Sequence, residues 1–348
     1  MLINLKVIFF ISHPKHSNSN CMKKSLVLLA GAFLFGISCN KSITSEEQES
    51  LSPEETTSAL QRNCGADEVL QQQLKADPTL RQKMNAIEDF TRQVQMNPSA
   101  YRLVNGIIEI PVVVNVLYKT TAQNISQTQI QSQIDVLNKD FSATNSDYNN
   151  TPSIFQGVRS GDIGVRFVLA GVVRKKTNKT SWQLNDAMKK STQGGINPTS
   201  PTTTLNLWVC NLTSGYLGYA QFPGGAAATD GVVCDDNAFG TTGTAAAPFN
   251  KGRTATHEVG HWMNLRHIWG DATCGNDLVG DTPVHNTANY GCPAAGHTST
   301  CSGNPVEMTM NYMDYTDDSC MYMFSAGQKT RMLAIFAAGG PRNSFAQP

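Results

Sequence analysis

Runs of β-branched and aromatic residues, separated by turn-forming segments, predict the strands of this chain. Ile107–Tyr118 is the longest run and is typical of a central strand. Val165–Val173, Leu205–Cys210 and Gly231–Cys234 predict further strands. Tyr216–Phe222 is short and alternating, as an edge strand is.

Apolar residues at helical spacing predict the helices. Ser126 is expected to cap one helix, with Gln129 completing a capping box. The apolar stripe of this helix is Ile130, Ile134, Leu137 and Phe141. A second amphipathic helix is expected over Ser325–Ala337, and residues 56 to about 100 mix further helical patterns.

The segment HEVGHWMNLRH, residues 257–267, carries the strongest chemical signal in the sequence. On an α-helix His257 and His261 lie four residues apart, so both imidazoles project from one face. That spacing suits two ligands of one zinc ion, with Glu258 beside the metal as a general base. The alternative is a chance occurrence of the motif on an ordinary surface helix.

A zinc ion bound in this way needs a third protein ligand, and His267 is the candidate. On a continuous helix it would lie about 600° and about 9 Å beyond His261, away from the metal. We expect a turn near Asn264, because asparagine, after glycine, best tolerates the left-handed conformation that ends helices. A zincin with a glutamate ligand is the alternative, but Glu307, the only glutamate after Glu258, lies in a stretch without helical pattern.

HEVGHWMNLRH, followed by NYMDYTDDSC at residues 311–320, resembles the pappalysin family of metzincin metalloproteases. The resemblance covers roughly residue 107 to the C-terminus and departs where Asn264 replaces a glycine. It implies an α+β zincin domain with a twisted, mostly parallel five-stranded sheet. An edge strand and an active-site helix would lie above an irregular, disulfide-stapled lower half. The implied activity is hydrolysis of protein or peptide substrates.

In such a site zinc keeps one position open for water, whose pKa it lowers, and polarises the scissile carbonyl. Glu258 would remove the proton of the water and deliver it to the departing amine. Met313 resembles the methionine that forms an apolar floor beneath the histidines in this family; an ordinary core methionine is the alternative. Tyr315 is expected to donate its hydroxyl to the oxyanion, unless it is a structural tyrosine bonded to backbone.

Asp318 is the candidate specificity residue, because the family has an acidic residue two positions before the last cysteine of this segment, in the pocket for the residue after the cut. A buried carboxylate there would favour Arg or Lys, and Arg more because it binds bidentately. Tyr101–Arg102 is then the expected self-activation cut. By resemblance, Tyr219 and Ala220 lie on the edge that pairs with an extended substrate.

The N-terminal hundred residues predict export and a pro-segment. Residues 1–21 are expected to be an extension upstream of a secretory signal at 22–39, whose apolar core is too short to span a membrane. Its end resembles a lipobox, so Cys39 is expected to carry lipid; ordinary signal cleavage is the alternative. Residues 40–102 are predicted to be a tether and pro-segment, and residues 103–348 the catalytic domain.

Cys64-Gly65 in the pro-segment resembles the cysteine switch of the family. There a thiolate occupies the fourth zinc position and excludes the catalytic water, which would keep the enzyme latent as a zymogen. The alternative is a disulfide partner for Cys64.

Composition narrows the partners and the compartment. The 348 residues include 27 basic and 27 acidic side chains, so no nucleic acid partner is expected, and membrane contact only through an N-terminal lipid. Nine cysteines favour an oxidising compartment. A surface binding module with a decayed metal site is the alternative class, but Glu258 and all three histidines are present.

Setting aside Cys21, Cys39 and Cys64 leaves six cysteines, for which 15 pairings are possible. The family resemblance suggests Cys274–Cys301 and Cys292–Cys320, which leaves Cys210–Cys234 as a third bridge. These bridges would staple the lower half.

The loop from Asp277 to Thr282 offers carboxylates, carbonyls and a hydroxyl, which are the ligands that calcium prefers. Resemblance to a calcium-binding loop of the family makes Asp277, Asp281 and Thr282 candidate calcium ligands. A solvated acidic turn is the alternative.

Overall fold

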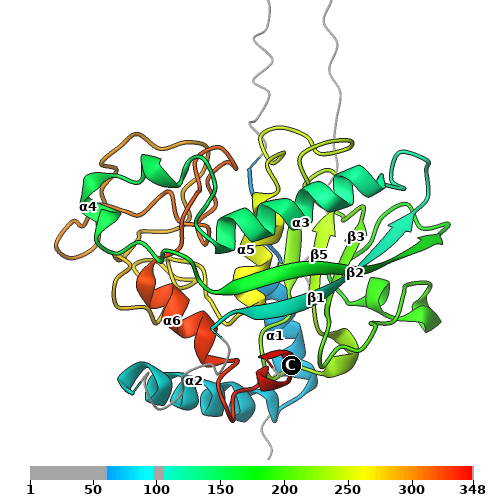
Figure 1. The fold of residues 1–348 in the computed structure, drawn as a ribbon, viewed down its shortest axis with the longest axis horizontal. Helices are drawn as coiled ribbons and strands as arrows, with labels where there is room; N and C mark the ends of the chain where they lie inside the picture. Colours follow the sequence, from blue (N-terminus) through cyan, green and yellow to red (C-terminus); the bar gives the residue numbers. More distant parts are fainter. Residues whose placement is uncertain (1–60, 98–105, 347–348) are drawn as a thin grey trace, which may run out of the picture. The chain divides into compact units, whose positions relative to one another are not determined.

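The computed structural model describes residues 61–97 and 106–346 (Figure 1). These described residues form one compact unit. The predicted signal, Cys39 and the Tyr101–Arg102 bond lie outside the described residues. No helix in the described part of the chain combines the length and apolar character needed to cross a membrane.

Five strands form one sheet in the order β2-β1-β3-β5-β4, which confirms the predicted mostly parallel sheet. They are β1 (Ile108–Tyr118), β2 (Val165–Lys176), β3 (Leu205–Cys210), β4 (Gly218–Ala220) and β5 (Val232–Asp235). Neighbouring strands are parallel except β4, which runs antiparallel to β5 and forms the edge, as predicted. β4 is shorter than the predicted Tyr216–Phe222 because only three of its residues pair with β5.

Six α-helices in the described residues accompany this sheet. They are α1 (Ala66–Ala76), α2 (Leu80–Met96), α3 (Gln127–Phe141), α4 (Ser153–Gln156), α5 (Arg253–Trp262) and α6 (Ala326–Ala334). Of these, α1, α3 and α5 pack against the strands of the sheet. Short 3-10 turns lie at Tyr148–Asn150, Ala187–Lys189, Ser191–Gln193, Ala227–Thr229 and Asn343–Ala346. In Figure 1, α3 lies along the sheet, and α2 packs beside α6.

Local side-chain bonds set where α3 and α6 begin. The Ser126 hydroxyl accepts the Gln129 amide at 3.0 Å, so the predicted cap of α3 is confirmed. The Gln129 side chain donates instead to the Phe239 carbonyl at 2.9 Å, so the capping box is only half formed. At α6 the box is complete, between Ser325 and Gln328. That helix ends at Ala334, earlier than predicted.

The sheet buries side chains on both faces. One face carries the main core under α3 and α5, with Val114, Leu207 and Cys234 among its members. The other face carries a second cluster that includes Trp208 and Cys210. Successive residues of a strand point to opposite faces, so each central strand contributes to both clusters.

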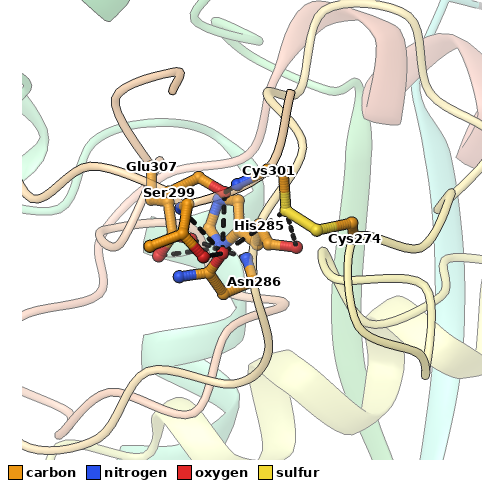
Figure 2. Close-up of a disulfide and its surroundings, with 7 residues drawn as sticks. Cys274, His285, Asn286, Ser299, Cys301 and Glu307 are labelled. Atoms are coloured by element: carbon orange, nitrogen blue, oxygen red, sulfur yellow. Dashed lines mark hydrogen bonds and ion pairs between the residues drawn. A yellow bond between two sulfur atoms is a disulfide. The ribbon is translucent and has the colours of Figure 1, made fainter. Parts of the chain in front are cut away.

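Two of the three predicted disulfides are present, Cys274–Cys301 and Cys292–Cys320. Their partners lie 27 and 28 residues apart in a region with little regular structure, so each bridge stabilises the fold by about 3–4 kcal/mol in the chain-entropy model. Figure 2 shows Cys274–Cys301 beside His285, whose carbonyl lies 3.5 Å from the Cys301 sulfur.

The predicted Cys210–Cys234 bridge is wrong, because both cysteines are free and buried. They lie on the neighbouring strands β3 and β5, where Cys234 is paired with Val209 rather than with Cys210. This offset of one residue puts the two thiols on opposite faces of the sheet, in different core clusters.

Candidate metal centre

The helix α5 ends immediately after His261, as the sequence predicts. Asn264 has φ +74°, the left-handed conformation. Its amide donates to the His261 carbonyl at 2.9 Å, and the Leu265 amide donates to the Gly260 carbonyl at 2.9 Å. This bond pair defines a Schellman ending, which satisfies the last carbonyls of the helix and reverses the chain. His267 is thereby returned to the helix face that carries the first two histidines.

The three histidines converge through their Nε2 atoms. The Nε2 atom of His261 lies 3.1 Å from that of His257 and 3.1 Å from that of His267. The Nδ1 atoms of His257 and His261 face the carbonyls of Tyr312 at 2.6 Å and Leu265 at 2.8 Å. A carbonyl only accepts, so both Nδ1 atoms carry the proton, and the Nε2 lone pairs of these two rings point at each other.

Such an arrangement suits a cation. Zn–N bonds of about 2.0–2.1 Å at tetrahedral angles place two ligand nitrogens about 3.3 Å apart, close to the observed spacing. Burial lowers the pKa of His257 well below its usual value. Burial, together with the neighbouring His267, lowers the pKa of His261 to about 3. Both rings are therefore neutral, the state in which imidazole binds a metal.

Cys64 completes the group. Its sulfur and the three histidine ligand atoms lie within 4.8 Å of one another, and all four residues are buried. Burial and the adjacent Glu258, whose Oε2 lies 3.3 Å from the sulfur, raise the pKa of the Cys64 thiol. A metal ion among these groups reverses that balance, because a coordinated thiol loses its proton.

Glu258 lies one residue after the first histidine and faces the same space. Burial raises its pKa to about 8. The edge strand comes close at this point: a Cβ on Gly218 would lie 2.9 Å from the Glu258 Cγ and 2.8 Å from the Val233 carbonyl oxygen. Glycine at this position lets β4 pass directly over the glutamate.

Met313 and Tyr315 lie on two sides of the histidines. A Cβ on Gly260 would come within 2.5 Å of the Met313 sulfur, so the fully buried Met313 packs directly under the helix between His257 and His261. The Tyr315 hydroxyl donates to the Cys64 carbonyl at 3.1 Å. The tyrosine is thus bonded to backbone, but to backbone of the predicted pro-segment.

Asp318 is fully buried and binds a partner that we did not anticipate. Nη2 of Arg62 lies 2.5 Å from Oδ1 of Asp318, and the two side chains are 1% and 0% exposed. Arg62 also donates to the Thr316 carbonyl at 3.2 Å. The other Asp318 oxygen accepts the amides of Lys251 at 2.8 Å and Arg253 at 3.2 Å. A basic residue two positions before Cys64 was the sequence signal for this contact.

The segment carrying Arg62 and Cys64 pairs with the edge strand. The Leu217 amide donates to the Asn63 carbonyl at 2.8 Å, and the Gly65 amide donates to the Gly218 carbonyl at 2.9 Å. Cys64 and Gly218 form a parallel bridge.

Tyr219 and Ala220 both lie in β4, but their side chains point to opposite faces of the sheet. The Tyr219 hydroxyl donates to Asp186 at 3.0 Å, and its ring belongs to the second core cluster. Ala220 belongs to the main core cluster. Any contact of these two residues with a substrate strand is therefore made by backbone.

The predicted calcium ligands do not converge in the structure. The Thr282 hydroxyl donates to Asp277 at 2.9 Å, whereas Asp281 accepts from the Ser325 hydroxyl at 2.6 Å and the Gly327 amide at 2.7 Å. The Asp281 side chain thus binds the residues at the start of α6. Within residues 61–97 and 106–346, only the group of Cys64 and the three histidines brings three or more metal-ligating side chains so close. Calcium binding by this loop stays a prediction from the sequence.

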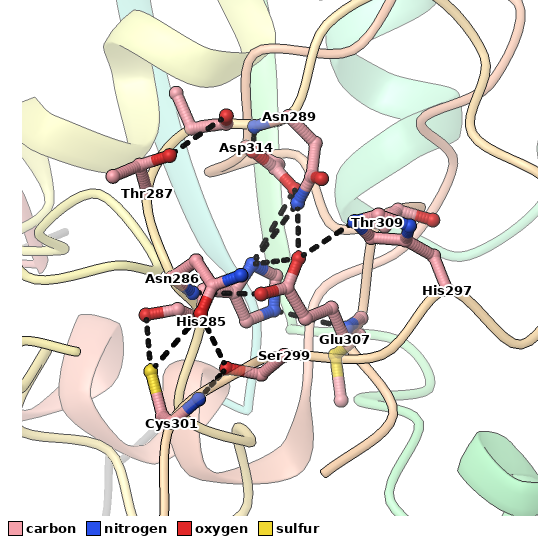
Figure 3. A network of polar contacts seen from close by, with 12 residues as sticks. His285, Asn286, Thr287, Asn289, His297, Ser299, Cys301, Glu307, Thr309 and Asp314 are labelled. Carbon is pink, nitrogen blue, oxygen red and sulfur yellow. Dashed lines mark hydrogen bonds and ion pairs between the residues drawn. The ribbon is translucent and has the colours of Figure 1, made fainter. Parts of the chain in front are cut away.

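A buried polar network supports the segment that precedes Tyr315 (Figure 3). The Asp314 carboxylate accepts the amides of Asn289 at 2.9 Å and Tyr315 at 2.8 Å. His285 accepts the Met308 amide through Nε2 at 2.9 Å, so its Nδ1 proton faces Asp314, 3.5 Å away.

Glu307 belongs to the same network rather than to the metal centre. Its carboxylate accepts the Asn286 amide at 2.7 Å and the Asn289 side chain at 2.7 Å. A glutamate third ligand is therefore excluded by position.

Comparison with known proteins agrees with this geometry. Residues 201–337 match the peptidase M43 family described as pregnancy-associated plasma protein-A. An extracellular metalloprotease of Verticillium alfalfae is 34% identical over 239 residues, which are 64% of this chain and 77% of that protein.

Two similar solved structures come from one protease. A promirolysin mutant of Tannerella forsythia is 40% identical, with a TM-score of 0.75, and the match covers 82% of this chain and 97% of that one. Mature Tannerella forsythia mirolysin in complex with a cleaved peptide is 44% identical, with a TM-score of 0.66, covering 69% and 95%.

Proposed function

This chain belongs to the pappalysin-type peptidase M43 family and is a zinc metalloendopeptidase, and we propose that His257, His261 and His267 hold its zinc. The observation that carries this assignment is the convergence of the three Nε2 atoms. That of His261 lies 3.1 Å from each of the other two, and the Cys64 sulfur belongs to the same group. Without a cation, lone pairs would face each other in a buried space, which is unfavourable.

Glu258 is the general base of the proposed reaction. A bound zinc supplies Lewis-acid polarisation of the scissile carbonyl and acidifies a water. Glu258 then takes a proton from that water and delivers it to the departing amine nitrogen. Tyr315 donates its hydroxyl to the developing oxyanion. Its present hydrogen bond to the Cys64 carbonyl supports this role, because it places a donor at a carbonyl that lies beside the histidines.

The proposed specificity is for arginine or lysine after the scissile bond. The support is that the buried carboxylate of Asp318 already holds a guanidinium, that of Arg62. Arg62 also stacks over the Phe249 ring, with its guanidinium carbon 5.0 Å from the centroid. A pocket with a charged end and an aromatic wall fits arginine better than lysine.

The same contacts explain latency, which we propose depends on Cys64 as a fourth zinc ligand. In a substrate, the scissile carbonyl at the zinc precedes the residue in the Asp318 pocket. In the pro-segment the order is reversed, since Arg62 precedes Cys64. The pro-segment therefore crosses the cleft backwards and offers no peptide bond in a productive orientation. Its parallel bridge to Gly218 agrees, because a substrate in the opposite direction would pair antiparallel with β4.

Activation then requires removal of the pro-segment, and Tyr101–Arg102 is the proposed cut because arginine follows that bond. We also propose export, which is supported by relatives named extracellular metalloproteases. Two outcomes of export are possible: lipid attached to Cys39, or ordinary cleavage of the signal peptide. Mass spectrometry of the mature N-terminus distinguishes them.

Substitution of the base tests the catalytic assignment. Glu258→Gln should lower peptide hydrolysis by at least about 100-fold while one equivalent of zinc is retained, because general acid–base catalysis contributes about 10²–10⁴. His261→Ala should lose both zinc and activity. Normal hydrolysis by the Glu258→Gln protein would refute the proposed role.

A further inference from the structure

We propose that Asp271 is a positioning residue for the third zinc ligand. Its carboxylate accepts a hydrogen bond from the Nδ1–H group of His267 and fixes the orientation of that ring. It also makes the Nε2 atom a stronger electron-pair donor to the metal. This inference rests on the proposed function, because it takes the zinc to be held by the three histidines.

The three histidines differ in what receives their Nδ1 protons. His257 and His261 face neutral backbone carbonyls, those of Tyr312 and Leu265. His267 instead forms a short contact with the Asp271 carboxylate. A carboxylate partner draws the Nδ1 proton more strongly than a carbonyl does, which leaves more electron density on Nε2. His267 is therefore set apart from the other two ligands by its charged partner.

The chain adopts an unusual backbone to bring this carboxylate into place. The Gly270 amide donates to the His267 carbonyl at 2.8 Å, which closes a tight turn. Gly270 has φ +63°, and a Cβ there would lie 2.4 Å from the Asn276 nitrogen. Asp271 follows with φ +57°, also left-handed. A non-glycine residue in this region is disfavoured, and such residues concentrate at functional sites.

Trp269 holds the same ring from its face. The Trp269 and His267 rings stack with centroids 4.4 Å apart and planes inclined by 7°. The rings of Tyr315 and Trp269 pack edge to face, with centroids 4.7 Å apart. This packing hinders rotation of the imidazole, so its Nδ1 atom stays directed at Asp271. The contact is shielded as well, since the His267 and Asp271 side chains are 2% and 29% exposed.

Asp271→Asn is the informative substitution. Asparagine tolerates positive φ at least as well as aspartate and keeps an acceptor oxygen, so it removes the charge with little change in the turn. The matched control is Asp162→Asn, which removes a carboxylate from an ion pair with Arg166. Zinc affinity of the full-length chain is measured by competition with a chromophoric chelator, and stability of the zinc-free protein by thermal unfolding.

The expected result is a 10- to 100-fold loss of zinc affinity in Asp271→Asn, on the order seen when outer-shell partners are removed, with unchanged stability of the zinc-free protein. Asp162→Asn should bind zinc as the wild type does. Affinity within about twofold of the wild type in Asp271→Asn would overturn the inference. Failure of the wild-type chain to bind zinc would instead refute the proposed function.

A second measurement uses only the wild-type chain, so it does not depend on whether a variant folds. In the zinc-loaded wild-type chain, NMR should show the His267 Nδ1 proton more deshielded than those of His257 and His261. Equal shifts for the three protons would contradict a special role for Asp271.

Discussion

The guanidinium of Arg62 lies 2.5 Å from the carboxylate of Asp318, and both side chains are almost completely buried. This pair joins the pro-segment to the pocket that we propose selects substrates. A buried charge needs a partner of opposite sign, so the pocket is complete only when a basic side chain fills it. Latency and specificity therefore depend on the same aspartate.

Asp318→Asn is expected to remove the preference for a basic residue after the cut. The value of kcat/KM for an arginine substrate should fall at least about 30-fold, because loss of one partner of a buried charged hydrogen bond costs about 2–5 kcal/mol. Asp317→Asn, next to it, is the control and should leave specificity unchanged. Profiling both activated variants on a peptide library checks this, and an intact arginine preference in Asp318→Asn would count against the pocket.

Arg62→Gln and Cys64→Ala should each shorten the delay before the full-length chain becomes active. The first leaves Asp318 unpaired, and the second removes the sulfur beside the histidines. The measurement is a time course of peptide hydrolysis with the processed fraction followed on gels. Gln71→Ala, which removes an exposed bond to Asp67 on α1, is the control. An unaltered delay in both variants would show that latency lies elsewhere.

Glu88→Gln should loosen the pro-segment at a contact other than those made by Arg62 and Cys64. Glu88 of α2 binds Arg331 of α6, whose Nε donates to the Asn264 carbonyl at 2.7 Å. The Arg331 and Glu88 side chains are 2% and 14% exposed. Breaking such a pair costs about 3–5 kcal/mol, whereas the exposed neighbouring pair of Asp89 with Arg92 is worth about 0–1 kcal/mol.

The Tm of the full-length Glu88→Gln protein should therefore fall by several degrees, and that of Asp89→Asn should hardly move. After removal of the pro-segment, the preparations should have the same Tm as wild type. Equal effects of the two substitutions in the full-length chain would show that the Glu88–Arg331 pair does not hold the pro-segment.

The contribution of the Asp235 carboxyl to stability should decrease as the pH rises from about 4 to about 7. Burial raises the pKa of Asp235 to about 7, so the folded chain holds a proton that the unfolded chain has already lost in this range. The free energy of unfolding then falls with pH, at most by about 1.4 kcal/mol per unit for one group. Urea unfolding across this range should show a smaller decline for Asp235→Asn and the wild-type decline for the exposed Asp135→Asn.

The features predictable from sequence were those set by local spacing. The strands of the sheet, the pairing of His257 with His261 and the left-handed turn at Asn264 follow from residues within a few positions of one another. Asn264 shows this most clearly, since the bond from its amide that reverses the chain reaches back only to His261.

The features that were missed depend on contacts between distant segments. The prediction of a Cys210–Cys234 bridge was wrong because strand register decides which face of the sheet each thiol occupies. Arg62 was missed because its partner, Asp318, lies more than 250 residues away along the chain. Asp271 lies only four residues from His267, but its role depends on a left-handed backbone at a non-glycine residue, which spacing alone does not predict.

X-ray absorption at the zinc edge of the full-length chain tests the proposed metal centre most directly. Three nitrogens at about 2.0–2.1 Å and one sulfur at about 2.3 Å are predicted, with the sulfur replaced by oxygen once the pro-segment is removed. A zinc shell without sulfur in the full-length chain, or one with fewer than three imidazoles after activation, would contradict it.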